Sequence, residues 1–393
     1  MIAVEKAKEI LSDNARRGKT IKLPIAQTLG LVTAEDIYSP CDVPNFDNSA
    51  MDGYAIKWDE GNNRRKLNLS VSGKAGSGQI PQLSPDQAFR IFTGAPMPAG
   101  SDTVIPQEYV ESSADELTFE IDRFKKGSNV RLQGNQNNKG DLILKSESKI
   151  TPGTIGLLAS VGITEVPVYA PPSIAVVVTG DELKEIGEKL AYGEIYNSNG
   201  PTLQAYLKHL GVESSKVYKV KDDAESLGML VKDLLSQYDI LLFSGGISVG
   251  DYDFVKEALY ANRVEELFYK IKQRPGKPLF AGKTENQLVF ALPGNPASVI
   301  NCFNQYVKPM IKHWMGHSDV WASSAYLPTA NSFEKKPPLT FFLKGQITPE
   351  GVRILGGQES FNLISFGVCD VFVEIPEEMC TVEEGTLLKV YYW

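Results

Sequence analysis

The segment Tyr238-Asp-Ile-Leu-Leu-Phe-Ser-Gly-Gly-Ile-Ser-Val-Gly-Asp-Tyr-Asp-Phe254 decides the fold class of this chain. Its apolar run, Ile240 to Phe243, is typical of a parallel strand that is buried on both faces. The run ends at Ser244-Gly-Gly246, and glycines at the carboxyl end of such a strand let main-chain N–H groups approach an anion. Asp251 and Asp253 follow, so the segment predicts a phosphate site beside a metal ion. The alternative is an ordinary strand-to-helix turn with Asp251 as the helix N-cap.

The rest of the chain divides into three kinds of pattern. Strand and helix signals alternate from about 174 to 316, which predicts a doubly wound, mostly parallel α/β sheet. Strands are expected at 174–178, 215–220, 240–243 and 288–292, and helices at 201–210, 223–237, 254–261 and 297–314. Short β-prone runs among many Gly, Pro, Ser and Asn residues predict an upstream all-β module, followed by a linker at 166–172. Four apolar runs in the tail predict a small C-terminal β-barrel.

Composition limits the possible partners. The chain has 393 residues, 42% hydrophobic and 22% charged, which is typical of soluble globular proteins. Its net charge of -8 argues against nucleic acid or an anionic membrane as a main partner. No apolar run approaches the roughly 20 residues of a membrane-spanning helix, so we expect a cytoplasmic location. The cysteines and histidines show no metal-ligand spacing, which leaves carboxylates, Lys/Arg and main-chain amides to carry the chemistry.

Polar or glycine-rich turns adjoin the expected strands and helices at four places. They are Thr179-Gly-Asp-Glu182, Tyr196-Asn-Ser-Asn199, Ser244-Gly-Gly246 and Pro293-Gly-Asn-Pro296. Because the carboxyl ends of parallel strands share one edge of the sheet, we expect these turns to form one site. Each turn taken singly also fits a structural role, such as a helix cap at Asn295.

A basic segment completes the predicted anion site. It reads Lys270-Ile-Lys272-Gln-Arg274-Pro-Gly-Lys277-Pro278. In an extended conformation, alternation places Lys270, Lys272 and Arg274 on one side, before a rigid turn. Such a row neutralises a polyanion, and the alternative is a solvated edge strand protected by lysines.

Six motifs together resemble one known family. They are Ser49-Ala-Met-Asp-Gly-Tyr-Ala55, Phe92-Thr-Gly-Ala-Pro-Met-Pro98, Thr179-Gly-Asp-Glu-Leu183, Ser244-Gly-Gly-Ile-Ser-Val-Gly-Asp251, Pro275-Gly-Lys-Pro278 and Leu292-Pro-Gly-Asn-Pro-Ala-Ser298. In this order they are similar to the molybdopterin molybdenumtransferases, the family of MoeA and the gephyrin E domain. The resemblance covers nearly the whole chain.

The resemblance implies an elongated homodimer of four-domain chains. A MoaB/Mog-like α/β domain that binds molybdopterin is expected at 172–317, and a C-terminal β-barrel domain at 318–393. An all-β domain is expected at 46–139. It would sit on an elongated linking and dimerisation domain made of 1–45 and 140–171.

The resemblance also implies a reaction. Molybdate is inserted into adenylylated molybdopterin in the presence of magnesium, and AMP is released, as the last step of molybdenum cofactor biosynthesis. Such a substrate fits a site with an anion cradle, a divalent metal and basic neighbours. The molybdopterin adenylyltransferase is the expected upstream partner. A non-catalytic molybdopterin-binding scaffold and a paralogue that inserts tungstate are the alternatives.

The family's functional positions transfer to this chain residue by residue. The expected catalytic residues are Asp52, Thr93, Glu182, Asp222, Asp253, Lys270 and Arg274. Among them, Glu182, Asp222 and Asp253 are the expected magnesium ligands, while Asp52 and Thr93 are expected to reach the site from the partner subunit. The expected substrate-binding residues are Thr179, Gly180, Ser198, Ser244, Gly245, Gly246, Lys277, Pro293, Gly294, Asn295, Lys344 and Ser360. Of these, Lys344 and Ser360 are expected to hold the oxyanion.

Three positions depart from the family's pattern. Gln136 stands where an aspartate is usual, Arg274 where a lysine is usual, and Lys344 where an arginine is usual. The first exchange removes a charge. The other two keep the charge, but only arginine offers a planar, bidentate fork to an oxyanion. These exchanges put the oxyanion affinity and selectivity of this chain in question.

Overall fold

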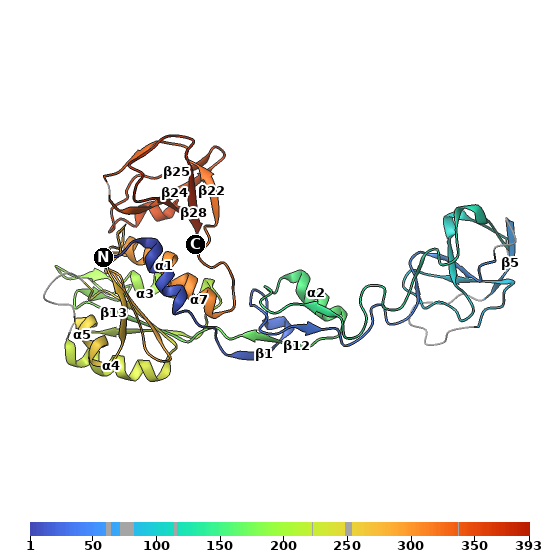
Figure 1. Ribbon diagram of the computed structural model, residues 1–393, viewed down its shortest axis with the longest axis horizontal. Coiled ribbons are helices and arrows are strands. Elements are labelled where there is room, and N and C mark those ends of the chain that lie inside the picture. The colour runs from blue at the N-terminus through green and yellow to red at the C-terminus, as the bar shows by residue number, and fades with distance from the viewer. Residues whose placement is uncertain (60–63, 71–81, 114–115, 222, 248–253, 337) are drawn as a thin grey trace. The chain divides into compact units, whose positions relative to one another are not determined.

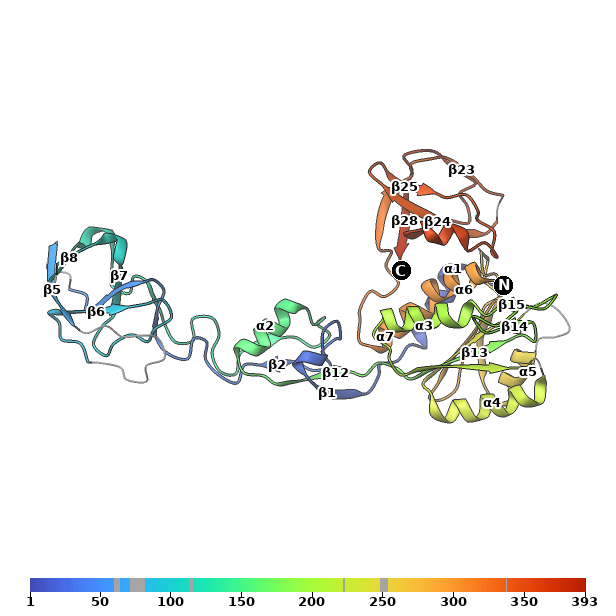
Figure 2. The same ribbon diagram turned by 180° about the vertical axis from the view of Figure 1, so that it is seen from behind.

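The computed structural model describes residues 1–59, 64–70, 82–113, 116–221, 223–247, 254–336 and 338–393. The chain forms two compact units. Unit 1 consists of Met1–Lys22, Gly30–Ala34 and Pro167–Trp393, and unit 2 consists of Leu23–Leu29 and Glu35–Val166. Figure 1 and Figure 2 show the elements of both units from opposite sides. The finer division into four domains stays a prediction.

A six-stranded sheet forms the centre of the α/β domain in unit 1. Its strand order is β16 (Ser215–Val220), β13 (Ile174–Thr179), β17 (Ile240–Ser244), β21 (Leu288–Leu292), β20 (Phe280–Lys283) and β18 (Glu265–Tyr269). The first four strands are parallel, and β20 pairs antiparallel with both of its neighbours, β21 and β18. Every residue of β13, β17 and β21 is buried, as expected for central strands that helices cover on both faces. The predicted doubly wound, mostly parallel sheet is confirmed.

Helices cover both faces of this sheet (Figure 1, Figure 2). They are α3 (Asn199–His209), α4 (Ala224–Gln237), α5 (Phe254–Ala261), α6 (Pro296–Cys302), the π-helix η4 (Phe303–Val307) and α7 (Lys308–Trp314). On one face, Val231 of α4 and Leu259 of α5 pack in one hydrophobic core with Phe243 of β17. On the other face lie α3 and the continuous helical run from α6 to α7 (Figure 2). This arrangement leaves the carboxyl ends of the parallel strands at one edge of the domain.

A second sheet in unit 1 forms the C-terminal domain. Its strands are β19 (Gln273–Arg274), β24 (Thr340–Thr348), β26 (Val371–Ile375), β28 (Leu387–Tyr392) and β22 (Ala325–Pro328), with β25 (Gly351–Ile354) paired to β24. Short strands β23 (Phe333–Glu334) and β27 (Thr381–Val382) pair separately, and η5 covers Ile364–Gly367. Leu343, Val373 and Val390 belong to its core. This barrel-like sheet confirms the predicted small β-barrel. Its strand β19 comes from the α/β segment, which the sequence did not predict.

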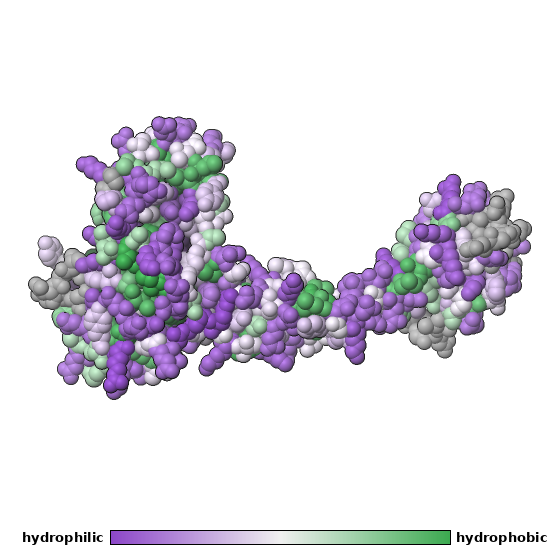
Figure 3. All heavy atoms as spheres, in the orientation of Figure 1, coloured by the Kyte–Doolittle hydropathy of each residue, from purple (hydrophilic) through white to green (hydrophobic). Residues whose placement is uncertain are grey.

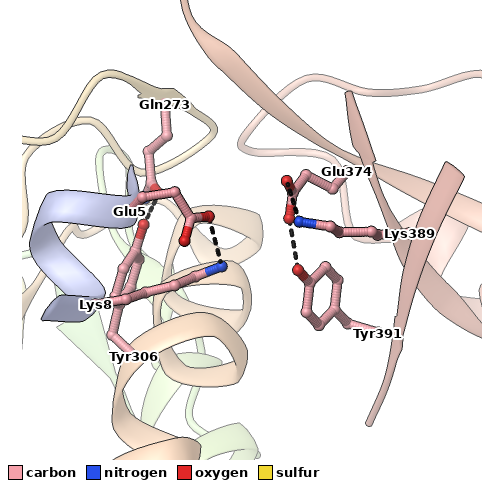
Figure 4. Close-up of polar contacts among 7 residues, drawn as sticks. All are labelled: Glu5, Lys8, Gln273, Tyr306, Glu374, Lys389 and Tyr391. Atoms are coloured by element: carbon pink, nitrogen blue, oxygen red, sulfur yellow. Dashed lines mark hydrogen bonds and ion pairs between the residues drawn. The ribbon is translucent and has the colours of Figure 1, made fainter. Parts of the chain in front are cut away.

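Charged side chains face one another between the N-terminal helix α1 (Val4–Asp13) and the C-terminal sheet (Figure 4). Lys8 donates to Glu5 at 3.3 Å, and its ammonium lies 5.6 Å from the centroid of the Tyr391 ring. On the sheet, Glu374 accepts a hydrogen bond from the Tyr391 hydroxyl and pairs with Lys389 at 3.7 Å. Lys8 and Glu374 are both buried, so each buried charge has a partner of opposite sign.

Unit 2 contains a six-stranded sheet. Its order is β7 (Thr103–Pro106), β4 (Gly53–Ile56), β6 (Gln87–Ile91), β5 (Arg64–Ser70), β9 (Glu116–Glu120) and β8 (Val110–Ser112). Neighbouring residues of β4 enter different cores, since Ala55 packs in one cluster and Ile56 in another. The predicted all-β module is confirmed.

The remaining elements are short strands, 3-10 turns and one helix. The paired strands are β1 (Thr20–Pro24) with β12 (Glu165–Tyr169), β2 (Ile37–Tyr38) with β11 (Leu142–Leu144), β3 (Asn48–Ser49) with β10 (Val130–Arg131), and β14 (Leu183–Lys184) with β15 (Ile195–Tyr196). The 3-10 turns are η1 (Ile25–Gln27), η2 (Gln107–Tyr109) and η3 (Ile121–Arg123). Helix α2 (Pro152–Ser160) begins after Thr151, whose hydroxyl oxygen accepts from the main-chain N–H of Thr154 at 3.2 Å.

Two sequence expectations were wrong. The linker expected at 166–172 is largely strand β12, because Val166 and Val168 are buried and the strand pairs with β1. The continuous extended segment expected from Lys270 is interrupted, because Lys270 has φ +66 and only Gln273–Arg274 is in a strand. The alternation that was to place Lys270, Lys272 and Arg274 on one side therefore fails.

The surface agrees with the charged composition of the chain. On the face that Figure 3 shows, hydrophilic residues predominate, and hydrophobic residues gather in separate patches. Within the described residues, no helix has the length and the apolar character needed to cross a bilayer.

Candidate active site

The carboxyl ends of three parallel strands line up at one edge of the α/β sheet. Val178 of β13 pairs with Ser244 of β17, which in turn pairs with Leu292 of β21. The turns that follow these strand ends border an open cleft with a volume of about 580 Å³. A cleft of this size suits a ligand as large as a nucleotide. The structure thus brings together the turns that the sequence predicted to share one edge.

The turn after β17 requires its two glycines. Gly245 has φ +92 and Gly246 has φ +63, a left-handed region that other residues rarely adopt. A Cβ on Gly245 would lie 2.7 Å from the carbonyl oxygen of Thr179, and one on Gly246 would lie 2.6 Å from Cγ2 of Val255. Only glycine fits both positions, and it leaves the main chain of this turn open to a ligand.

Asn199, at the start of α3, joins two of the strand ends. Its side-chain amide donates to the Ser244 hydroxyl at 2.9 Å and to the carbonyl oxygen of Gly294 at 2.8 Å. These bonds fix the turns after β17 and β21 relative to each other. The sequence placed Asn199 in a candidate turn but did not assign it to the site, because only the fold shows that this amide reaches two other strands.

The side-chain hydroxyl of Thr179 lies at this edge of the sheet. Its hydroxyl oxygen is buried and has no hydrogen-bond partner among the described residues. It would lie 2.9 Å from a Cβ on Gly246, so it borders the glycine turn. A buried hydroxyl without a partner is costly, and a ligand that bonds to it removes this cost.

Ten of the expected site residues line this cleft. They are Thr179, Gly180, Glu182, Ser198, Ser244, Gly245, Gly246, Pro293, Gly294 and Asn295. Glu182 is the only charged side chain among the described lining residues. Asp222 and Asp253, the other two expected magnesium ligands, lie outside the described residues. Within the described part of the chain, no group of three or more His, Cys, Asp or Glu residues is placed to hold a metal ion.

The expected oxyanion residue Ser360 lies on a loop of the C-terminal domain that meets the cleft. Its hydroxyl accepts from the Asn295 side-chain amide at 3.0 Å, and its carbonyl accepts from the main-chain N–H of Ala297 at 3.0 Å.

Lys344 is a buried residue that binds the main chain of the same loop. Its ammonium donates to the carbonyls of Gly357 and Asn362, and the residue is only 2% exposed. Burial lowers the pKa of Lys344. Lys344 is therefore placed to position the loop and does not line the cleft.

The basic turn is anchored to the helical run beneath it. Tyr306 of η4 donates to the side-chain oxygen of Gln273 (Figure 4). Gln273 in turn donates to the carbonyl of Gly276 at 2.9 Å. Asn301 donates to the carbonyl of Pro275 at 3.0 Å. All three side chains are buried, so the conformation of this turn depends on them.

The four basic residues of this segment do not line the cleft, although Pro278 does. Lys270 lies with its ammonium 4.7 Å from the centroid of the Tyr269 ring. Arg274 lies 5.5 Å from the Phe341 ring and lines a separate cavity of about 250 Å³ together with Lys335. Lys277 is exposed. The structure therefore separates the main-chain anion cradle from the basic side chains that the sequence grouped with it.

Asp52 and Thr93, both in unit 2, form a pair of their own. One carboxylate oxygen of Asp52 accepts from the Thr93 main-chain N–H and from its hydroxyl, each at 2.7 Å. These two hydrogen bonds, the main-chain one first, lower the pKa of Asp52, and the positive charge of Arg90 adds to the effect. Gln136, one of the departures, donates from its side-chain amide to Asn137 at 3.3 Å.

Comparisons with known proteins decide the family. The model of the MoeA N-terminal region (domain I and II) matches residues 2–162, and the model of a probable molybdopterin binding domain matches residues 175–313. The molybdopterin molybdenumtransferase of Staphylococcus aureus strain Mu50 is 33% identical over 386 residues, which cover 95% of this chain and 91% of that protein. This chain belongs to the MoeA family. A Staphylococcus epidermidis relative of the same name is 32% identical over 383 residues, covering 95% of this chain and 91% of the relative.

Solved MoeA structures have the same fold. A crystal structure of the molybdopterin biosynthesis MoeA protein from Pyrococcus horikoshii superposes with a TM-score of 0.83 at 29% identity, covering 100% of this chain and 99% of that one. A second structure from the same organism gives a TM-score of 0.84 at 24% identity and covers both chains completely. The resemblance that the six motifs predicted is confirmed. The matched molybdopterin-binding region contains all ten of the expected residues that line the cleft.

One lining residue of this MoeA family member had no signal in the sequence. Phe361 borders the cleft from the C-terminal loop and is 71% exposed. An aromatic residue in an irregular loop has no periodicity to mark it, and its neighbour Ser360 was expected only from the resemblance.

Proposed function

We propose that this chain inserts molybdate into adenylylated molybdopterin and releases AMP. The observation that supports this most directly is the cleft, in which the Gly245-Gly246 turn and the unpaired Thr179 hydroxyl border the same strand edge. Main-chain donors and a hydroxyl suit phosphate oxygens. In the proposed reaction two Mo–S bonds form and replace two Mo–O bonds of molybdate, and the phosphoanhydride bond of the substrate breaks. The equivalent of one displaced oxygen completes the phosphate of AMP, and the other leaves as water with protons from the dithiolene thiols and the solvent.

Binding of the phosphates is assigned to neutral groups. The turn from Ser244 to Gly246 and the main chain of Gly294 surround the cradle, with Asn199 holding both in place. Fixed dipoles of this kind stabilise charge without rearranging during the reaction. The resemblance assigns Lys270 and Arg274 to the charge that develops as the phosphoanhydride is cleaved, but neither residue lines this cleft, so we assign no phosphate contact to them.

The oxyanion is assigned to the loop of Ser360. Because the Ser360 hydroxyl oxygen accepts from Asn295, its hydrogen is left to donate to another acceptor. Lys344 supports this loop through the two carbonyls on either side of Ser360. We therefore assign Lys344 a positioning role, which replaces the direct oxyanion contact expected from the sequence.

Magnesium dependence is part of the proposal. Glu182 is the only charged side chain among the described lining residues, and it is negative. A phosphate beside this carboxylate is repelled unless a cation lies between them. Carboxylate and phosphate oxygens are ligands that Mg²⁺ prefers, so Glu182 fits this role, with Asp222 and Asp253 as the remaining ligands expected from the sequence. When bound there, magnesium supplies positive charge to the phosphates.

We further propose that the protein acts as a cytoplasmic homodimer that receives its substrate from the molybdopterin adenylyltransferase. Asp52 and Thr93 of one subunit would then complete the site of the partner subunit. The carboxylate of Asp52 is held in a fixed orientation for this role by two hydrogen bonds from Thr93. Mixing Asp52→Ala and Asp253→Ala variants tests it, since re-assorted dimers should regain about a quarter of wild-type activity. No recovery after subunit exchange would contradict a shared site.

The reaction itself is tested by AMP release from adenylylated molybdopterin with molybdate and magnesium. Asp253→Ala should lower kcat by about 100-fold or more, as the loss of a group that stabilises the transition state does. Asp251→Ala is the matched control and should leave kcat within about 3-fold of wild type, because the family's acidic positions include Asp253 and leave Asp251 the alternative role of a helix N-cap. Full turnover by Asp253→Ala would exclude the proposed catalytic role. Tungstate added to the same assay measures the selectivity for the oxyanion.

A further inference from the structure

We propose that Phe361 is a platform on which a planar heteroaromatic ring of the substrate stacks. The identity of the substrate rests on the function proposed above. Phe361 lines the same cleft as the Gly245-Gly246 turn, but it belongs to the C-terminal domain. The cleft therefore has a polar edge suited to phosphate and an apolar aromatic side chain at another part of its wall.

Phe361 is exposed in a way that local packing does not explain. It is 71% exposed, although a phenyl ring gains free energy when it is buried. Single exposed hydrophobic residues are common on protein surfaces, so exposure alone does not indicate a site. Two further observations support a site: the ring lines the same cleft as the glycine turn, and hydrogen bonds hold the main chain on both sides of it.

The residues on either side of Phe361 are fixed by hydrogen bonds. Ser360 accepts from Asn295 and from Ala297, each at 3.0 Å. Asn362 accepts at its carbonyl from the buried ammonium of Lys344 at 3.0 Å. An aromatic side chain on a main chain held in this way loses little conformational entropy when a ligand binds, which favours stacking.

A second aromatic residue lines the cleft from the α/β domain. Tyr196 of β15 is 45% exposed, and its hydroxyl donates to the carbonyl of Glu188 at 2.8 Å, which restrains the ring. The aromatic residues of the described lining are thus Tyr196 and Phe361, one from each domain. Aromatic rings bind planar heterocycles through their faces, and the contact tolerates different heterocycles. The proposed substrate offers two such rings, a pterin and an adenine.

The test measures binding of four probes to the full-length protein by titration calorimetry. The probes are AMP, molybdopterin, adenylylated molybdopterin and ribose 5-phosphate, which has no aromatic ring. Phe361→Leu keeps an apolar side chain of similar size but removes the ring, and Phe361→Trp keeps an aromatic face. Ile364→Ala is the matched control, because Ile364 lies on the same loop, is 90% exposed and does not line the cleft.

Phe361→Leu should raise the Kd of adenylylated molybdopterin by about 5- to 150-fold, the range for loss of one stacked base. Phe361→Trp and Ile364→Ala should bind within about 3-fold of wild type, and ribose 5-phosphate should not distinguish the variants. A loss confined to AMP identifies the adenine as the stacked ring, and a loss confined to molybdopterin identifies the pterin. In turnover, KM should rise while kcat stays within about 3-fold, since the ring acts in binding alone.

Equal binding of all probes by wild type and Phe361→Leu would overturn the platform. If wild type releases AMP in that case, the proposed function stands and only the platform is lost. If wild type neither binds the ring-bearing probes nor releases AMP, both proposals are lost. An equal loss in Ile364→Ala would also overturn the platform, because it would show that any change in this loop disturbs the cleft.

Discussion

We expect the Thr179→Val substitution to raise the stability of the protein and to weaken its binding of AMP. The Thr179 hydroxyl is buried without a partner among the described residues, and an unpaired buried hydroxyl costs about 1–3 kcal/mol. Valine replaces the hydroxyl by a methyl group of similar size, so no hydrogen bond within the described protein is lost. The free energy of unfolding of the ligand-free protein should therefore rise, by about 1 kcal/mol.

The same substitution should weaken the binding of AMP. If the hydroxyl donates to a phosphate oxygen, its loss should cost about 1.5–3 kcal/mol, because the acceptor is charged. The Kd of AMP should then rise by about 10- to 150-fold. Urea denaturation without ligand gives the stability, and titration calorimetry with AMP and magnesium gives the Kd.

Thr179→Ser is the control for this pair of measurements. It keeps the hydroxyl and removes a methyl group, so it should lower the stability by about 1 kcal/mol and leave the Kd of AMP near the wild-type value. The reasoning is refuted if Thr179→Val destabilises the protein and binds AMP as tightly as wild type. That result would mean that the hydroxyl has a partner within the folded chain and no role in the cleft.

Three further substitutions test the surroundings of the cleft. Tyr306→Phe should destabilise the protein by about 1–3 kcal/mol in urea because it leaves the buried Gln273 oxygen unpaired, and an unchanged urea midpoint would contradict this contribution. Lys344→Met should raise the KM for molybdate by about 10-fold, because the loop of Ser360 loses its support, while stability stays within about 1 kcal/mol of wild type; an unchanged KM would remove the positioning role. Burial, and then the charge of a neighbouring lysine, lower the pKa of Lys308 from 10.5 to about 8, so wild-type stability should rise by about 1–3 kcal/mol as this group loses its proton between pH 8 and 10.5. Lys308→Met should remove this rise, as urea midpoints across that range would show, and an identical pH dependence in both proteins would contradict the lowered pKa.

The sequence predicted the centre of the α/β sheet well because its strands are buried on both faces. β13, β17 and β21 read as continuous apolar runs, and each ends at a turn with its own glycine or proline signal. The strands β18 and β20, which pair antiparallel with each other, were missed. β18 is an edge strand of mixed polarity with two of its five residues exposed, so neither alternation nor a continuous apolar run marks it.

The parts of the site that follow from the parallel topology of the sheet were predictable from the sequence. The glycine turn and the residues that follow each strand were expected at one edge because parallel topology brings them there. The basic row was misplaced because it rested on local alternation, which the left-handed conformation of Lys270 breaks. Asn199 and Phe361 act through tertiary contacts, and a single sequence carries no periodic signal for such contacts.

The phosphate cradle is largely neutral, whereas the basic turn that pairs with the C-terminal sheet is positively charged. The cradle for phosphates lies within the α/β domain and is built from neutral groups, with Glu182 as the only charge among its described residues. Arg274, in contrast, lies on β19, which pairs with β24 of the C-terminal sheet, and Ser360 lies on a C-terminal loop bonded to Asn295. The basic turn and the oxyanion loop therefore depend on how the C-terminal sheet packs against the α/β domain, whereas the phosphate cradle does not. A variant that loosens this packing, such as one lacking the ion pair between Lys272 and Glu377, should weaken the response to molybdate before it weakens the binding of ribose 5-phosphate, which has no ring to contact the C-terminal loop.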